Sequence, residues 1–268
     1  MKLFTKEDFM VDTTISSSNS KNSIIYKGKI ITNEQLIALK MPKISEKNNI
    51  IFNFKREVEV LKNIRDCTNI CELISYHIDE IETISNKTFI CYEFMSNGTL
   101  SSLLMMSSSY KEQDITVSIA MALNYLHKKG FMHRDIKSSN ILLDSNFTPK
   151  LGGFDLSCSY FNEEELTPET GTYRWMAPEI IRHEKYNNFA DVYSYGILLW
   201  EIFTREVPYA DMSAIEAAYE VAKNNLRPYI SLGITPRKKA LICRCWHEDP
   251  KARPSFEDIV GLLPSLYL

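Results

Sequence analysis

The eight residues His133-Arg134-Asp135-Ile136-Lys137-Ser138-Ser139-Asn140 decide how this sequence is interpreted. Five further stretches lie around them in a definite order. They are Ala38-Leu39-Lys40, the helical segment that carries Glu57, Gly171 to Glu179, Asp191 to Gly196, and Cys245-Trp246 followed by Arg253-Pro254. One such stretch could arise by chance, but six in order along 268 residues indicate a single architecture that spans the chain.

The pattern of apolar residues changes along the chain from strand-like to helical. Short β-type runs lie at 24–26, 36–39, 72–78 and 88–94, with one helical repeat at 52–64. Beyond Ser96-Asn97-Gly98, which breaks the pattern, the repeats are helical at 115–126, 191–203 and 236–246. This order predicts an α+β fold. We expect one domain over 1–268, with a small β-rich lobe at about 1–95 and a larger helical lobe at about 96–268.

The composition excludes several classes of protein. A formal net charge of −3 offers no basic surface for nucleic acid or for an anionic membrane. The longest apolar stretch, around residues 195–200, is far too short to cross a bilayer. Six cysteines lack a zinc-binding spacing, so we expect reduced thiols in a cytoplasmic protein that neither binds nucleic acid nor inserts into a membrane.

The central motif is similar to the catalytic loop H-R-D-x-x-x-x-N of the protein kinases. With the other stretches, it makes the chain resemble that family over nearly its whole length, and most of all its tyrosine-kinase-like branch. The resemblance implies a bilobal kinase fold in which Lys40 holds the α- and β-phosphates of ATP and Glu57 holds Lys40. Asp135 would accept the substrate hydroxyl proton, Asn140 would ligate magnesium, and Lys137 would contact the transferred phosphoryl group.

The segment Gly153-Phe154-Asp155 departs from the family pattern, which is Asp-Phe-Gly at this place. Gly153 takes the metal-binding position and has no side chain with which to bind. Asp155 lies two residues further on, roughly 7 Å along an extended chain, whereas a magnesium–oxygen bond is about 2.1 Å long. We expect that only a local refolding could bring Asp155 to the metal, and we predict no metal site.

The phosphate-binding loop is the second departure. Ser18, Ser20 and Ser23 stand where the family has three glycines. Glycine allows positive φ and a close approach of the backbone to phosphate, and serine in a left-handed conformation costs roughly 1–2 kcal/mol per site. The two departures together predict a chain that is not an enzyme, in which Asp135 and Asn140 are vestigial. No cofactor is then required, and ATP binding is expected to be weak and independent of metal.

The other residues implied by the kinase resemblance lie at the hinge and in the helical lobe. Tyr92 takes the gatekeeper position, where its bulk would narrow the nucleotide pocket, and Glu93-Phe94-Met95 forms the hinge. Glu179 and Arg253 resemble the buried ion pair of the family, and Asp191 resembles the aspartate that holds the catalytic loop. We expect structural roles for these three residues.

An activation segment is expected between Leu156 and Gly171. It contains hydroxyl side chains that a partner kinase could phosphorylate, each phosphate adding a charge of about −1.5 to −2. The candidate sites are Ser157, Ser159, Thr167 and Thr170.

The segment Lys150 to Ser157 is similar to the mixed lineage kinase domain-like family of necroptosis, in which Gly-Phe-Glu replaces Asp-Phe-Gly. Ser23 to Lys29, Ile78 to Glu82 and Asn97 to Leu100 resemble the same family. The resemblance implies a pseudokinase that sequesters a partner kinase of the receptor-interacting family and so inhibits necroptotic death of a host cell. The family's N-terminal four-helix bundle has no counterpart before residue 24, so we expect a viral homologue that acts in the host cytoplasm.

Two stretches leave other functions open. His133-Arg134-Asp135 and Ala177-Pro178-Glu179 have the standard kinase form. They are compatible with a weakly active serine/threonine kinase of the tyrosine-kinase-like branch. A signalling scaffold that binds nucleotide without transferring phosphate is a further alternative.

Overall fold

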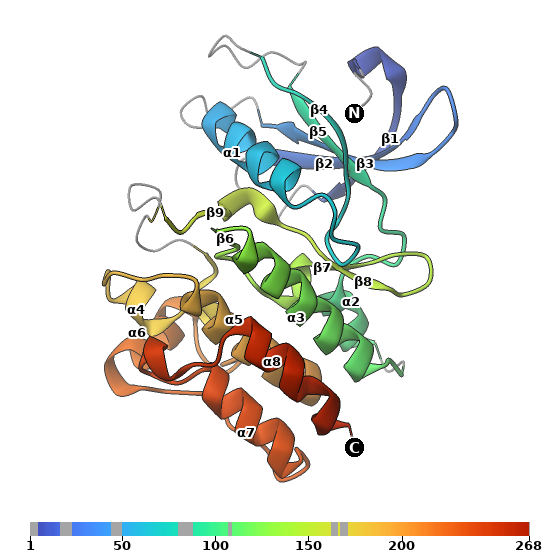
Figure 1. Cartoon of the computed structure of the whole chain (residues 1–268). Coiled ribbons are helices and arrows are strands. Elements are labelled where there is room, and N and C mark those ends of the chain that lie inside the picture. Colours follow the sequence, from blue (N-terminus) through green and yellow to red (C-terminus); the bar gives the residue numbers. More distant parts are fainter. Residues whose placement is uncertain are drawn as a thin grey trace.

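The computed structural model of the chain describes residues 5–16, 23–43, 50–79, 88–106, 109–161, 166 and 171–267. These residues form a sheet lobe with one long helix and a larger helical lobe (Figure 1). The chain passes from one lobe to the other between Glu93 and Leu100. The predicted α+β architecture with a small β-rich lobe and a larger helical lobe is confirmed.

Five antiparallel strands form the sheet in the order β1-β2-β3-β5-β4. They are β1 (Phe9–Ser16), β2 (Ser23–Ile30), β3 (Leu36–Pro42), β4 (Leu73–His77) and β5 (Phe89–Glu93). Gly28 lies inside β2 opposite Val11 of β1. A Cβ at this position would stand 2.6 Å from the Met10 carbonyl oxygen, so the close approach of the two strands requires glycine. The strand therefore continues beyond the run at 24–26 that the sequence predicted.

Ser23 is a strand residue rather than a loop residue. It is the first residue of β2, pairs with Pro42 of β3, and is 1% exposed. The prediction that Ser23 belongs to the phosphate-binding loop is wrong, because strand pairing extends to the last residue of β3. The other two residues of that prediction, Ser18 and Ser20, lie outside the described residues.

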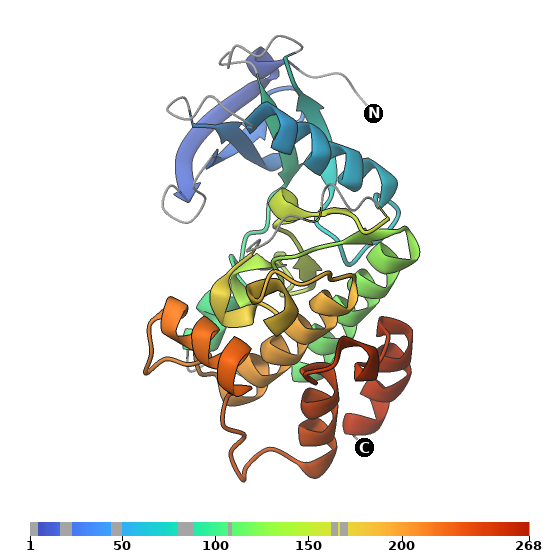
Figure 2. The same cartoon turned by 90° about the vertical axis from the view of Figure 1, so that its left-hand side faces the viewer.

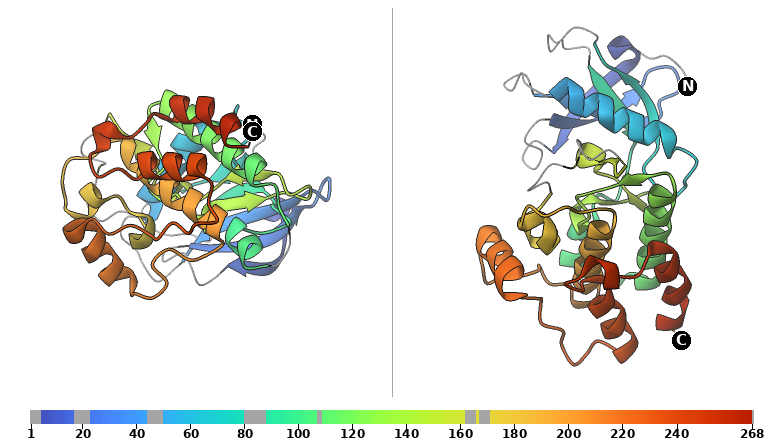
Figure 3. Two further views of the ribbon diagram at one scale, coloured as in Figure 1. Left: turned by 90° about the horizontal axis from the view of Figure 1, so that it is seen from below. Right: turned by 60° about the vertical axis from the view of Figure 1, so that its left-hand side comes forward.

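Helix α1 (Ile50–Asn63) lies across the sheet on the side of the helical lobe, as Figures 2 and 3 show. Its buried residues include Ile50, Phe54, Val58 and Leu61, which recur at helical spacing. Glu57 is buried on the same helix. A charged residue on an apolar face needs a partner, so this position points to the site between the lobes.

The helical lobe is built around α5. Its helices are α2 (Leu100–Met105), α3 (Glu112–Lys128), α4 (Pro178–Ile181), α5 (Phe189–Thr204), α6 (Ala214–Asn224), α7 (Pro236–Cys245) and α8 (Phe256–Leu262). Every residue of α5 from Ala190 to Ile202 is buried. A helix that is buried all round belongs to the centre of a core. None of the helices in the described ranges combines the length and apolarity that a membrane span requires.

Two short strand pairs position the motif segments. β6 (Phe131–Met132) pairs with β9 (Cys158–Ser159), and β7 (Ile141–Leu143) pairs with β8 (Pro149–Leu151). The segment 133–140 therefore runs from β6 to β7, and the segment 152–157 runs from β8 to β9. Because each end of one segment is paired to an end of the other, the two motifs are held side by side.

Candidate active site

Lys40 and Glu57 form a buried ion pair between β3 and α1. Lys40 Nζ lies 2.6 Å from Glu57 Oε2, and the two side chains are 4% and 3% exposed. Strand β3 pairs with β2 on one side and β5 on the other, which fixes the backbone of Lys40. The ion pair therefore links α1 to the sheet.

The Tyr92 hydroxyl donates a hydrogen bond to the second carboxylate oxygen of Glu57. Tyr92 lies on β5 opposite Ala38 of β3. Burial raises the pKa of Glu57, against the opposing effects of Lys40 and of the Tyr92 hydrogen bond. The predicted gatekeeper thus also holds the carboxylate that pairs with Lys40.

Asp155 reaches Lys40 from the other side. Lys40 Nζ lies 2.5 Å from Asp155 Oδ1, and the Asp155 side chain is 48% exposed. Burial alone would raise the pKa of Asp155, but the charge and hydrogen bond of Lys40 hold that pKa below its usual value. For Lys40, burial lowers the pKa, and the carboxylates of Asp155 and Glu57 more than offset it. Both members of this contact are therefore charged at neutral pH.

The segment 153–156 is folded into a tight turn, which explains how Asp155 reaches Lys40. Gly153 has a φ of 77°, and residues 154–156 form a single 3₁₀ turn. Phe154 is 1% exposed and its ring packs on His133, with 4.9 Å between ring centroids. Arg56 Nη2 of α1 donates to the Asp155 carbonyl oxygen at 3.2 Å. The extended geometry on which the sequence prediction rested does not hold here.

Asn140 occupies the space beside Gly153. A Cβ at Gly153 would lie 2.5 to 2.7 Å from the Asn140 Cγ, Oδ1 and Nδ2 atoms. Asn140 Nδ2 donates to the Asp135 carbonyl oxygen at 2.7 Å and to Asp135 Oδ2 at 2.9 Å. The Asn140 amide group is thus held by the catalytic loop. It fills the space that the side chain of a larger residue at position 153 would occupy.

Two side chains orient Asp135 in addition to Asn140. Thr172 Oγ1 donates to Asp135 Oδ1 at 2.7 Å, and Lys137 Nζ lies 2.7 Å from Asp135 Oδ2. Lys137 Nζ also donates to Thr172 Oγ1 at 2.6 Å. Asp135 and Lys137 remain 15% and 20% exposed. Sequence reasoning missed Thr172, whose only signal was its place in the stretch Gly171 to Glu179.

Asp191 of α5 binds the backbone of the catalytic loop through its carboxylate. It is 1% exposed and accepts hydrogen bonds from the backbone N–H groups of His133 at 2.8 Å and Arg134 at 2.9 Å. Burial alone would raise the pKa of Asp191, but the hydrogen bond and charge of His127, followed by His133, lower it. The His133 Nε2–H donates to the Gly152 carbonyl oxygen at 2.8 Å. The loop is therefore tied both to α5 and to the segment before Gly153.

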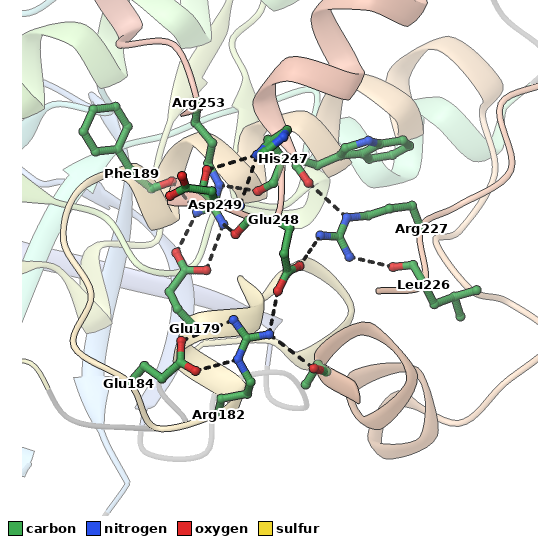
Figure 4. Close-up of polar contacts among 12 residues, drawn as sticks. Glu179, Arg182, Glu184, Phe189, Leu226, Arg227, His247, Glu248, Asp249 and Arg253 are labelled. Carbon is green, nitrogen blue, oxygen red and sulfur yellow. Dashed lines mark hydrogen bonds and ion pairs between the residues drawn. The ribbon is translucent and has the colours of Figure 1, made fainter. Parts of the chain in front are cut away.

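The ion pair of Glu179 and Arg253 lies in the helical lobe (Figure 4). Arg253 Nη1 and Nη2 donate to the two Glu179 carboxylate oxygens at 2.6 and 2.9 Å. Beside this pair, the Glu248 carboxylate binds two arginines. Its Oε1 lies 2.7 Å from Arg182 Nη1, and its Oε2 lies 2.9 Å from Arg227 Nη2. Both groups join α4 and its C-terminal end to the segment between α7 and α8, so Glu179 and Arg253 lie among structural contacts.

Of the predicted hinge residues, Glu93 is held by side-chain contacts and Met95 is buried. The Glu93 carboxylate points toward β8, where both of its oxygens accept hydrogen bonds from Lys150 Nζ at 2.7 and 2.8 Å. Glu93 Oε1 also accepts from the Glu72 backbone N–H at 2.7 Å. Met95 is 7% exposed. The Glu93 side chain is therefore committed to Lys150, and its backbone N–H donates to the Glu72 carbonyl oxygen at 3.1 Å.

The candidate phosphorylation sites differ in accessibility. Ser157 is fully buried and its hydroxyl donates to the His133 carbonyl oxygen at 3.3 Å. A kinase cannot reach this hydroxyl in the folded chain, so the prediction of Ser157 as a site is wrong. Ser159 is half-buried in β9 and accepts a hydrogen bond from the Phe161 N–H at 3.3 Å. Thr167 and Thr170 lie outside the described residues.

The chain is similar to known protein kinases along most of its length. The family described as protein tyrosine and serine/threonine kinase matches residues 17–263. Serine/threonine-protein kinase STY17 of Arabidopsis thaliana is 33% identical over 90% of this chain and 42% of its own length. Serine/threonine/tyrosine-protein kinase HT1 of the same plant is 34% identical over 92% of this chain and 64% of its own length. Probable serine/threonine-protein kinase drkC of Dictyostelium discoideum is 32% identical over 86% of this chain and 32% of its own length.

These relatives contradict the prediction that the chain is not an enzyme, because they are named as kinases. The sequence prediction also placed Asp155 too far away to take part in the site, whereas the turn at 153–156 brings its carboxylate to Lys40. The comparisons do not show a relationship to the mixed lineage kinase domain-like family, a role in necroptosis or a viral source.

The chain spans less than two thirds of the length of each of these relatives. The family match, however, covers both lobes and all the residues of the site described above. On this basis the chain belongs to the protein tyrosine and serine/threonine kinase family.

Proposed function

We propose that this chain is the catalytic domain of an ATP-dependent serine/threonine protein kinase. The observation that carries the proposal is the orientation of Asp135, whose two carboxylate oxygens are held by Thr172 and Lys137 while the side chain stays partly exposed. A general base must be fixed and reachable by its substrate hydroxyl. The names of the relatives, which include serine/threonine kinases, support the choice of acceptor.

Each residue of the site has a defined task in this proposal. ATP supplies the transferable phosphoryl group, and phosphoryl transfer depends mainly on positioning and on electrostatic stabilisation. Lys40, fixed by Glu57 and charged at neutral pH, would hold the phosphates. Asp135 would accept the proton of the attacking hydroxyl. Lys137, with its ammonium group beside Asp135, would balance the negative charge that develops on the acceptor oxygen.

The proposal is tested by identifying the amino acid that receives the phosphate. The purified chain is incubated with radiolabelled ATP, a divalent cation and a peptide library that contains serine, threonine and tyrosine acceptors. We expect label in phosphoserine or phosphothreonine and none above background with Asp135→Asn. Label found only in phosphotyrosine would contradict the acceptor class, and equal labelling by both proteins would contradict the proposal itself.

Binding of this chain to a kinase of the receptor-interacting family stays a prediction. It depends on the resemblance of residues 150–157 and on no contact in the structure. Co-precipitation from cells competent for necroptosis tests it, and failure to recover that kinase would remove the prediction without affecting the proposed phosphotransfer.

A further inference from the structure

We propose that Asp155 takes over the task of the carboxylate that is missing at Gly153, so that nucleotide binds this chain only together with a divalent cation. The inference rests on the proposed function, because it assumes that Lys40 holds the phosphates of ATP. It goes further by assigning the cation to a residue two positions beyond the usual one. It replaces the metal-independent binding that the sequence predicts.

The position of Asp155 supports this assignment. Its Oδ1 lies 2.5 Å from Lys40 Nζ, the atom proposed to contact the phosphates. The other carboxylate on Lys40, that of Glu57, is 3% exposed and shared with Tyr92, whereas Asp155 is 48% exposed. Of the two carboxylates, Asp155 is therefore the one that an incoming ion can reach.

The charges at Lys40 favour a cation as a companion of the nucleotide. One ammonium group faces the two carboxylates of Glu57 and Asp155, so the cluster carries a net negative charge when all three are ionised. The triphosphate of ATP is also strongly negative, and like charges brought together without compensation oppose binding. The nucleotide must either displace Asp155 from Lys40 or bind with a cation between the phosphates and Asp155.

The surrounding contacts hold Asp155 in place and so favour the second route. Arg56 donates to the Asp155 carbonyl oxygen at 3.2 Å, and Phe154 is buried against His133. Both contacts fix the turn from which the carboxylate projects. Displacing the Asp155 carboxylate would break its contact with Lys40, whereas a cation bound at the second carboxylate oxygen would leave that contact in place.

The donor set fits a magnesium or manganese ion. Asn140 uses its Nδ2 to bind Asp135, which leaves Oδ1 as an oxygen donor next to Gly153. Asp155, two residues further on, offers a carboxylate. Magnesium in nucleotide sites is bound by one or two carboxylates together with phosphate oxygens and water. One carboxylate, one amide oxygen and the phosphates are donors of the types that this preference names.

The test measures nucleotide affinity rather than activity. The full chain is titrated with the non-hydrolysable analogue AMP-PNP by calorimetry in buffers with MgCl₂, MnCl₂ or EDTA. Asp155→Asn keeps the shape of the side chain and removes its charge. Asp211→Asn makes the same chemical change at an exposed residue before α6 and is the matched control. Thermal melting confirms that each variant is folded. If Asp155→Asn is not folded, Asp155→Ser takes its place in the titration.

We expect the wild-type chain and Asp211→Asn to bind AMP-PNP at least tenfold more tightly with magnesium than with EDTA. Asp155→Asn should bind with similar affinity in both buffers, and in EDTA at least as tightly as the wild type. Retention of the tenfold magnesium effect by Asp155→Asn would overturn the inference, as would wild-type binding that ignores the cation or no binding in any buffer.

Phosphotransfer measured on the same proteins separates this inference from the proposed function. Cation-dependent binding that requires Asp155, without transfer to any peptide, would support the inference and contradict the proposed function. Transfer by a chain whose binding does not depend on Asp155 would support the proposed function and overturn the inference.

Discussion

At the residue scale, the site is governed by the groups around one buried lysine. Lys40 contacts Glu57 and Asp155, and Glu57 also accepts the Tyr92 hydroxyl. Buried charges are stable only when they are paired and hydrogen-bonded. Removing any single partner therefore leaves an uncompensated group, and this makes the site sensitive to changes of a few atoms.

Gly153→Asp, which restores an aspartate at the usual place, is predicted to lower activity. A φ of 77° lies in the left-handed region, which costs most residues with a side chain roughly 1–2 kcal/mol and aspartate less. The new Cβ would also push Asn140 from its hydrogen bonds to Asp135, each contributing about 1 kcal/mol. Urea unfolding and initial rates of phosphotransfer measure the two effects.

Gly98→Asp is the matched control for this prediction. Gly98 has a φ of 71°, and a Cβ added there would meet no atom within 4 Å, so this position reports backbone strain alone. We expect Gly153→Asp to be destabilised more than Gly98→Asp. A gain of activity in Gly153→Asp at unchanged stability would show that Asn140 does not occupy the position as described.

Tyr92→Phe is predicted to destabilise the chain by about 1.5–3 kcal/mol, because a carboxylate that is 3% exposed loses a hydrogen bond. The free energy of unfolding in urea measures the effect. Tyr76→Phe on the adjacent strand β4 removes a hydroxyl from a half-buried tyrosine and should change stability by less than about 0.5 kcal/mol. Equal effects of the two substitutions would argue that Tyr92 does not support Glu57.

At the scale of elements, α5 carries two buried carboxylates that hold the loops of the site. Asp191 binds the backbone of His133 and Arg134. Glu201 accepts hydrogen bonds from the Ser138 hydroxyl in the catalytic loop and from Trp175 Nε1 at 3.1 Å. One helix thus positions both the catalytic loop and the segment after Thr172.

Glu201 makes the stability of the chain depend on pH. Burial raises the pKa of Glu201 from 4.5 to about 7. A carboxyl group with a raised pKa stabilises the fold below the unfolded pKa, and this contribution is lost as pH rises toward 7. The free energy of unfolding should therefore fall by roughly 3 kcal/mol between pH 4.5 and 7 on account of this group.

Glu201→Gln isolates this effect because glutamine does not titrate. Its amide oxygen can accept from Trp175 and its amide nitrogen can donate to the Ser138 hydroxyl. Urea unfolding at pH 5 and pH 7.5 should show the variant gaining stability relative to the wild type as pH rises. Parallel stability curves would mean that Glu201 is not protonated in the folded chain.

The sequence predicts some elements of the site far better than others. The helical spacing of Phe54, Val58 and Leu61 and the motif at 133–140 predicted a helix and a catalytic loop that the structure contains. The turn at 153–156 could not be predicted, since it depends on long-range contacts of Phe154 and Arg56. Strand β1 was also missed, because residues 9–16 show little alternation of apolar and polar side chains.

At the scale of the whole molecule, the site lies where the two lobes meet. Lys40 and Glu57 belong to the sheet lobe, whereas Asp135 and Asn140 belong to the helical lobe (Figure 1). Asp155, which lies between β8 and β9, contacts Lys40 across the two lobes. Rotation of one lobe against the other would therefore change the distance between Lys40 Nζ and Asp155 Oδ1.

The most direct test of the account is a comparison of phosphotransfer by the wild-type chain and by Asp135→Asn. Both proteins are assayed with radiolabelled ATP, magnesium and a serine peptide, under conditions in which thermal melting shows both to be folded. Removal of a general base lowers rates by about 10²–10⁴, so we predict at least a hundredfold loss in Asp135→Asn. A wild-type rate that does not exceed the rate of Asp135→Asn would contradict the account.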